Sequence, residues 1–245
     1  MQKKRTKRND KIKQSQQQQY GQGNIDNYES RYDNAPKVSN IKLIPKSEAQ
    51  KRYSNIINAN TVIFCTGPAG TGKTHVAIVK AARLLDEKKI KQIILCRPAV
   101  EAGEKLGFLP GTQEEKYMPW LKPIVAILVK CFGKGYTEYL FKSEKIVAEQ
   151  LGYMRGLTFE DAFVILDEAQ NCTPEQMKMF LSRIGDNCTM IIDGDTEQKD
   201  IKGNNGLTDA IWRLENEDQI GNMRFTDDDC VRSEMCKLIL KAYRK

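Results

Sequence analysis

The stretch Gly67-Pro68-Ala69-Gly70-Thr71-Gly72-Lys73-Thr74 matches the pattern G-x-x-x-x-G-K-[S/T], and it decides the fold. It follows an apolar run at residues 61–66 that is typical of a buried strand, and it opens the helical pattern of residues 73–88. Glycines let such a loop curl so that successive N–H groups face one anion, and the following helix adds a favourable dipole. The stretch therefore predicts a loop that cradles the phosphates of a nucleoside triphosphate.

We expect the whole loop to contact ATP. The Lys73 ammonium can reach the β- and γ-phosphates, and the Thr74 hydroxyl can ligate the Mg²⁺ that accompanies them. The predicted binding residues are Gly67, Pro68, Ala69, Gly70, Thr71, Gly72, Lys73 and Thr74.

A second apolar run, residues 162–166, delivers two carboxylates, Asp167 and Glu168, at its C-terminal end. In an open parallel sheet this end of the strands lines the ligand crevice. Asp167 is predicted to hold Mg²⁺, directly or through water. Glu168 is predicted to orient or deprotonate the attacking water.

A third apolar run, residues 189–193, is followed by Gly194, Asp195 and Gln198. Asp195 and Gln198 are expected to emerge beside Glu168, where they could sense the γ-phosphate. An ordinary strand-to-turn exit rich in Asp and Gly has the same appearance. The spacing alone supports the two interpretations equally.

Strand patterns alternate with helical patterns from about residue 41 onward. Strands are predicted at 61–66, 92–97, 162–167, 189–193 and, more weakly, 223–225; helices are predicted at 47–58, 73–88, 118–132, 174–184, 207–216 and 230–243. Such alternation predicts an α/β fold, a single mostly parallel sheet with helices on both faces. We expect residues 41–245 to form one P-loop ATPase domain.

Residues 1–40 have a different composition, rich in Lys and Arg and then in Gln. Seven basic residues and one acid in residues 1–13 contribute +6 of the chain's net charge of +7. This composition cannot bury enough apolar surface to offset the entropy of ordering, so a disordered tail is predicted. The tail is either a spacer or an arm that docks on nucleic-acid phosphates.

The seven cysteines include no C-x-x-C pair, and the chain has one histidine. This pattern argues against a disulfide framework and against a zinc site. No apolar run approaches the ~20 residues of a membrane span, and the sequence starts without the apolar segment of a secretory signal. The expected setting is the cytoplasm, with no membrane partner.

Four stretches together resemble the PhoH-like ATPases, whose core is similar to the first RecA-like domain of superfamily 1 helicases. They are the loop at 67–74, the long segment 97–111, the segment 167–180 that begins Asp-Glu-Ala-Gln-Asn, and Gly194-Asp195-x-x-Gln198. The resemblance runs from about residue 44 to 243. It implies a RecA-like fold, Mg²⁺-dependent ATP hydrolysis, and coupling to RNA or single-stranded nucleic acid in a helicase-like activity.

The resemblance also implies roles for single residues. Gln50 corresponds to a glutamine that recognises the adenine edge, and Asp195 and Gln198 to a motif that couples the γ-phosphate to nucleic-acid contact. Segment 97–111 occupies the place of a motif that contacts the nucleic-acid strand. The sequence departs from the family at Asp193, where a small or hydroxyl residue is more usual, so an extra acid is expected near the metal.

Two other functions stay open: an ATP-regulated binding or scaffold protein without unwinding activity, and a P-loop phosphotransferase, which Glu168 disfavours because it suits water activation. Superfamily 1 helicases place ATP between two RecA-like domains, whereas this sequence predicts one. A homo-oligomer, a hexameric ring, is therefore expected, in which a neighbour donates a catalytic arginine. Arg232 is the first candidate for that arginine, with Arg183 and Arg155 as alternates.

Overall fold

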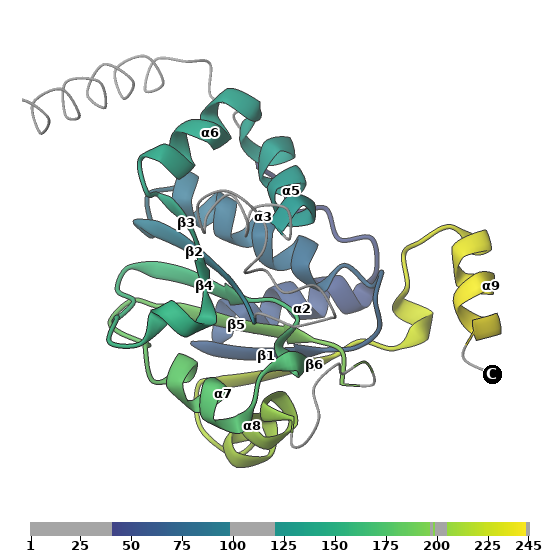
Figure 1. Ribbon diagram of the computed structural model, residues 1–245. Helices are drawn as coiled ribbons and strands as arrows, with labels where there is room; N and C mark the ends of the chain where they lie inside the picture. The colour runs from purple at the N-terminus through teal and green to yellow at the C-terminus, as the bar shows by residue number, and fades with distance from the viewer. Residues whose placement is uncertain (1–40, 99–120, 197, 199–204, 244–245) are drawn as a thin grey trace, which may run out of the picture.

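The computed structural model describes residues 41–98, 121–196, 198 and 205–243. Its centre is a six-stranded sheet in the order β3-β2-β4-β5-β1-β6 (Figure 1). All five pairings between neighbouring strands are parallel. The strands are β1 (Val62–Thr66), β2 (Gln92–Arg97), β3 (Ile146–Gln150), β4 (Ala162–Leu166), β5 (Thr189–Gly194) and β6 (Ile220–Arg224). The predicted class of fold is confirmed.

Helices cover both faces of this sheet (Figure 1). They are α2 (Glu48–Ala59), α3 (Lys73–Asp86), α5 (Lys122–Phe132), α6 (Lys134–Lys142), α7 (Pro174–Leu181) and α8 (Gly206–Leu214). A further helix, α9 (Glu234–Tyr243), lies apart from the sheet (Figure 1). Short 3-10 turns occur at η3 (Leu151–Met154), η4 (Ala169–Asn171) and η5 (Asp227–Asp229). None of the helices in these described ranges is both long enough and apolar enough to cross a bilayer.

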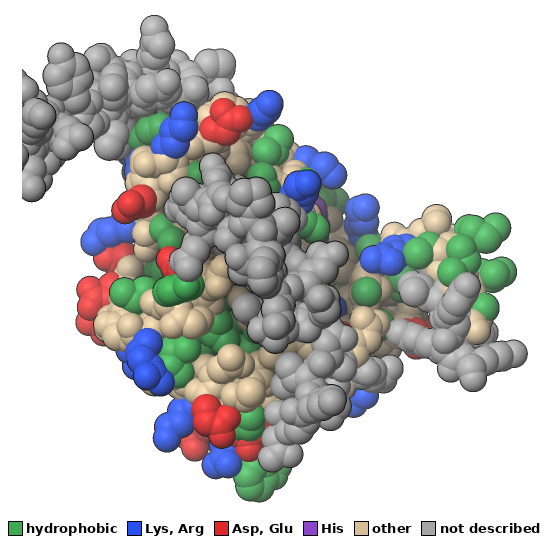
Figure 2. Space-filling model, viewed as in Figure 1, with side chains coloured by type: hydrophobic (Ala, Val, Ile, Leu, Met, Phe, Trp, Pro, Cys, Tyr) green, Lys and Arg blue, Asp and Glu red, His purple; other side chains and the backbone are tan. Residues whose placement is uncertain are grey.

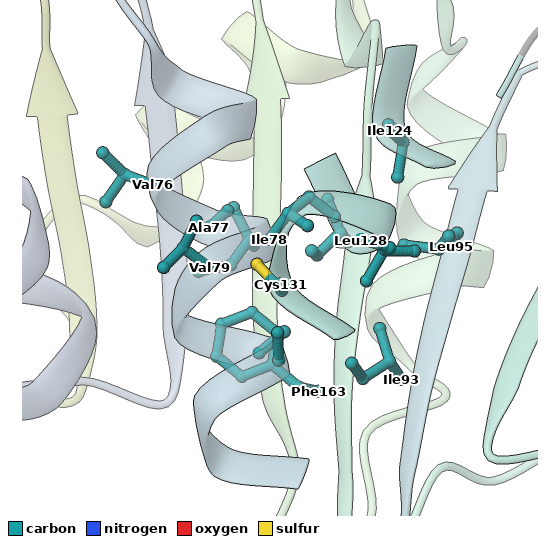
Figure 3. Close-up of a cluster of buried hydrophobic side chains, with 14 of the residues drawn as sticks. Val76, Ala77, Ile78, Val79, Ile93, Leu95, Ile124, Leu128, Cys131 and Phe163 are labelled. Carbon is teal, nitrogen blue, oxygen red and sulfur yellow. The ribbon is translucent and has the colours of Figure 1, made fainter. Parts of the chain in front are cut away.

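The core has two layers because successive side chains of a strand point to opposite faces. On one face, Ile63 and Ile165 pack with the buried sides of α2, α3 and α5, and Figure 3 shows part of this cluster around Ile78 and Phe163. On the other face, Phe64 packs with buried residues of α7 and α8. Both faces being covered explains why four strands are continuous apolar runs in the sequence.

The strand order brings three strand ends together. β5 lies between β1 and β4, and all three run in the same direction. The segments that follow them therefore emerge side by side at one edge of the sheet. The predicted loop, the predicted carboxylates and Asp195 all lie at this edge.

Some elements differ from the prediction. β3 and α6 were not predicted, α5 begins at Lys122 and the last helix begins at Glu234 instead of residue 230. The final strand, predicted at 223–225, spans Ile220–Arg224. Residues 1–40 and most of segment 97–111 lie outside the described residues, so the predicted tail and strand-contacting segment stay predictions.

Candidate functional site

The loop at residues 67–72 has the backbone that its glycines allow. Gly67, Gly70 and Gly72 have φ values of +136°, +88° and +88°, which side chains disfavour. The Gly67 N–H donates to Gly194 O at 3.2 Å, and the Val231 N–H donates to Gly70 O at 3.0 Å. The loop is thus tied to β5 on one side and to the segment after β6 on the other.

Lys73 is the first residue of α3 and its side chain folds over the loop. Its Nζ donates to Gly67 O at 2.7 Å and to Pro68 O at 3.1 Å. The same ammonium lies 3.9 Å from Asp193 Oδ1. Within the part of the chain that the structure describes, no side chain caps the start of α3. A helix N-terminus next to a buried cation is a favourable place for an anion.

Hydroxyl and carboxylate oxygens from three elements meet beside Lys73. Thr74 Oγ1 donates to Asp193 Oδ2 at 2.7 Å and lies 3.3 Å from Asp167 Oδ1. These are hard oxygen ligands, and Mg²⁺ is commonly held by one or two carboxylates together with the phosphates of a substrate. The residues present therefore fit Mg²⁺. Thr74 and Asp167 were the predicted ligands, and Asp193 adds a third oxygen group.

Asp193 is almost completely buried, with 1% of its surface exposed. The pKa of its carboxyl is raised to about 7, chiefly by burial and also by the nearby Asp167, against the lowering effects of Lys73 and the Thr74 hydrogen bond. Below that pKa the proton neutralises one of the acids that crowd this edge. The predicted extra acid therefore lies where its charge state is sensitive to pH near neutrality.

Asp193→Asn should flatten the dependence of stability on pH. A raised pKa means that the folded state binds more protons than the unfolded state between the ordinary value of 3.8 and about 7, so the free energy of unfolding falls as pH rises through that window. From pH 5 to 8 in metal-free buffer, the wild type should lose roughly 2 kcal/mol more than the variant, about 4–8 °C in Tm. The exposed control Asp186→Asn should follow the wild type; equal slopes for Asp193→Asn and wild type would contradict the prediction.

Arg97 is a site residue whose role sequence reasoning missed. Its Nε and Nη2 donate to Asp167 Oδ2 at 3.1 and 2.6 Å, and Nη2 lies 3.6 Å from Glu168 Oε1. Asp167 Oδ2 is therefore held by Arg97, while Oδ1 faces Thr74. The available signal was a charged residue at the C-terminal end of a buried strand, β2, which pairs with β4.

Glu168 is held by a second contact that the sequence did not reveal. Gln170 Nε2 donates to Glu168 Oε2 at 2.7 Å, and Gln170 Oε1 accepts from the Asp195 N–H at 3.0 Å. Gln170 is buried, whereas the Glu168 side chain is 44% exposed and accessible to water. This amide therefore links the ends of β4 and β5. Gln198 is exposed, and its N–H donates to Asp195 O at 3.2 Å.

Gln50 of α2 flanks the phosphate loop. Its Nε2 donates to Thr71 O at 2.9 Å, and its Oε1 accepts from the Lys46 N–H at 2.8 Å. A Cβ on Gly72 would lie 2.5 Å from Gln50 Nε2, so glycine is required for this close approach. Gln50 therefore lies against the loop, and its amide fixes the loop's backbone. Its predicted recognition of the adenine edge stays a prediction.

The three arginines proposed as donors to a neighbour occupy different places. Arg232 lies against Gly70 of its own chain, a position inside the site that the sequence did not predict. Arg183 donates to Met179 O and Leu157 O at the C-terminal end of α7, which gives it a local structural role. Arg155 is exposed after η3.

The family model described as PhoH-like protein matches residues 42–244. The chain belongs to the PhoH-like family. Its relatives include Protein PhoH of Escherichia coli strain K12, 44% identical over 205 residues that make up 82% of this chain and 58% of the relative. The PhoH-like protein of Bacillus subtilis strain 168 is 46% identical over 220 residues, 89% of this chain and 68% of the relative. This PhoH-like chain thus spans 58% of the length of the first of these relatives.

A solved structure supports the fold of this PhoH-like protein. The large terminase of a thermophilic bacteriophage superposes with a TM-score of 0.51 and 13% identity, covering 81% of this chain and 50% of the terminase. At this level of identity the likeness concerns the fold alone.

Proposed function

We propose that this PhoH-like chain binds ATP with Mg²⁺ and hydrolyses it, residues 41–245 forming the catalytic unit. The observation that carries the proposal is the meeting, at one sheet edge, of a cation over a glycine loop, a hydroxyl facing carboxylates, and a separate accessible carboxylate. These are Lys73, the Thr74–Asp167 pair and Glu168. Phosphoryl transfer needs this combination of charge stabilisation and a positioned water.

Each residue has a distinct task in this proposal. When ATP binds, the Lys73 ammonium would leave the carbonyl oxygens of Gly67 and Pro68 and donate to phosphate oxygens, whose negative charge it offsets. Thr74 and Asp167 would hold Mg²⁺, which neutralises part of the phosphate charge. Glu168, fixed by Gln170, orients the attacking water and accepts its proton. Gln50 would read the adenine edge from its place beside the loop.

We further propose that hydrolysis is coupled to RNA or single-stranded nucleic acid, which makes the protein helicase-like. The family resemblance and the basic stretch at residues 1–13 support this. Asp195 lies beside Gln170 and would report the state of the γ-phosphate together with Gln198. A regulated binding protein without unwinding activity is the alternative. A phosphotransferase is less favoured, because an accessible carboxylate such as Glu168 suits the activation of water.

Single-stranded RNA or DNA should raise kcat for ATP at least ~10-fold if nucleic acid completes the site. Steady-state ATPase assays with poly(U), single-stranded DNA and no nucleic acid measure this effect. Lys73→Ala, assayed in the same way, shows how much hydrolysis comes from a contaminant. Hydrolysis that no nucleic acid stimulates would favour the regulated binding protein.

We also propose a homo-oligomer, a hexameric ring, in the cytoplasm. Apolar side chains on α9 are exposed, with Met235 at 66%, Leu238 at 63% and Ile239 at 47%, and Figure 2 shows hydrophobic side chains gathered on this helix. Covering them against another copy would stabilise both chains. All seven cysteines are free, which supports a reducing compartment.

A further inference from the structure

We propose that Arg232 binds a phosphate group of the ATP held by its own chain. Residues 230–233 then line one side of the nucleotide site beside Gly70, and Gln50 lines it beside Gly72. This inference rests on the proposed ATP binding. It assigns the arginine in cis, whereas the sequence predicted a donation in trans.

The backbone after β6 runs over the phosphate loop. The Phe225 N–H donates to Thr66 O at 2.8 Å, which continues the β6–β1 pairing to the start of the loop. η5 then turns the chain, and a capping box between Thr226 and Asp229 fixes this turn. The Val231 N–H next donates to Gly70 O at 3.0 Å. Backbone bonds therefore attach this segment to the strand before the loop and to the loop's middle.

The Arg232 side chain lies on the loop. A Cβ built on Gly70 would be 2.5 Å from Arg232 Nε, 2.7 Å from Cδ and 2.9 Å from Cγ. Side chains essentially never approach so closely, so this packing requires glycine at position 70. Gly70 also has a φ of +88°, which a side chain would strain. Gly70 therefore both allows the loop to curl and leaves the space that the Arg232 side chain occupies.

The charge of Arg232 has no anionic partner among the residues that the structure describes. Its contact there is a weak one, from Nη1 to Cys236 Sγ at 3.7 Å, and the side chain is exposed. By contrast, Arg97 is paired with Asp167, and Arg213 with Asp209. A guanidinium favours two-pronged contact with phosphate oxygens. The Arg232 guanidinium, which lacks a described anionic partner and lies on a phosphate-binding loop, is therefore positioned to bind a phosphate group of the nucleotide.

The same contacts bear on assembly. To serve a neighbour's nucleotide, Arg232 would have to leave Gly70, and the Val231–Gly70 hydrogen bond would hold it back. A ring can still form through α9, but its interface need not supply this arginine. The cis assignment thus separates nucleotide binding from oligomerisation.

The first test measures the affinity for a fluorescent ATP analogue, with Mg²⁺ and without turnover, at a protein concentration below the wild-type Kd. Arg232→Ala should weaken binding about 10–100-fold, as expected for the loss of a charge-assisted contact, and Arg232→Lys should recover part of it. Arg52→Ala, which removes an exposed arginine of α2, is the matched control and should bind like wild type. Circular dichroism and Tm show that each variant is folded.

The second test mixes Lys73→Ala chains with Arg232→Ala chains. If Arg232 acts in cis, every nucleotide site in the mixture contains one of the two substitutions. The ATPase activity of the mixture should then equal the sum of the activities of the separate variants. Recovery of activity on mixing would overturn the inference and restore the trans assignment. Wild-type affinity in Arg232→Ala would also overturn it, whereas failure of the wild type to bind ATP would instead reject the proposed function.

Discussion

Glu168→Gln is expected to lower kcat for ATP ~10²–10⁴-fold, while the affinity for ATP changes less than about threefold. The amide keeps the shape of the carboxylate and its contact with Gln170, but it cannot accept a proton from water. Single-turnover hydrolysis and equilibrium binding of an ATP analogue measure the two quantities separately.

Lys73→Ala provides the contrast for this prediction. It removes the cation that folds over the loop, so both affinity and turnover should fall. An equal loss of affinity in the two variants would mean that Glu168 binds the nucleotide and is not the catalytic base.

Gly67→Ala should abolish ATP binding and destabilise the fold by about 2–4 kcal/mol. The new Cβ would lie 2.5 Å from Phe225 O and 3.0 Å from Phe225 C, and backbone atoms cannot rotate away as a side chain can. The φ of +136° adds strain. Either the loop or the end of β6 must move. Thermal unfolding and binding of the fluorescent analogue measure the effect.

Gly152→Ala is the matched control. Apart from its neighbours in the chain, none of the described residues has a heavy atom within 4 Å of the Cβ that it would add, and φ at this residue is not in the left-handed range. Its Tm and affinity should stay close to those of the wild type. Normal ATP binding by Gly67→Ala would show that the loop tolerates a different path, contrary to its close packing against Phe225.

Strands that are buried on both faces could be predicted from the sequence, and the half-buried edge strand could not. β1, β2, β4 and β5 are covered on both faces, so their sequences are continuous apolar runs. β3 was missed because it is an edge strand, and after Ile146 its residues are only half-buried and include Glu149 and Gln150. α6 was missed because a nine-residue helix that follows Gly133 carries little periodic signal.

The sequence predicted the place of a site residue where that residue belongs to a local motif. The loop, Asp167 and Glu168 follow from local motifs and from the rule that parallel strand ends share an edge. The contacts of Arg97, Gln170 and Arg232 depend on strand order, which local patterns do not determine. Arg97 meets Asp167 only because β2 pairs with β4, and Arg232 meets Gly70 only because β6 pairs with β1.

The pairing of β1 has a consequence for how the chain is made. β1 ends at residue 66, but its two partners begin at residues 189 and 220, so during synthesis it stays unpaired until the chain has been extended to residue 189. Strands β2, β3 and β4 can pair earlier, since all of them lie between residues 92 and 166. Late closure of distant strands is slow and leaves open edges that other chains can join. The anchors of the phosphate loop, Gly194 and Val231, also follow it by more than 100 residues, so a nascent chain acquires its nucleotide site only after residue 231 has been added.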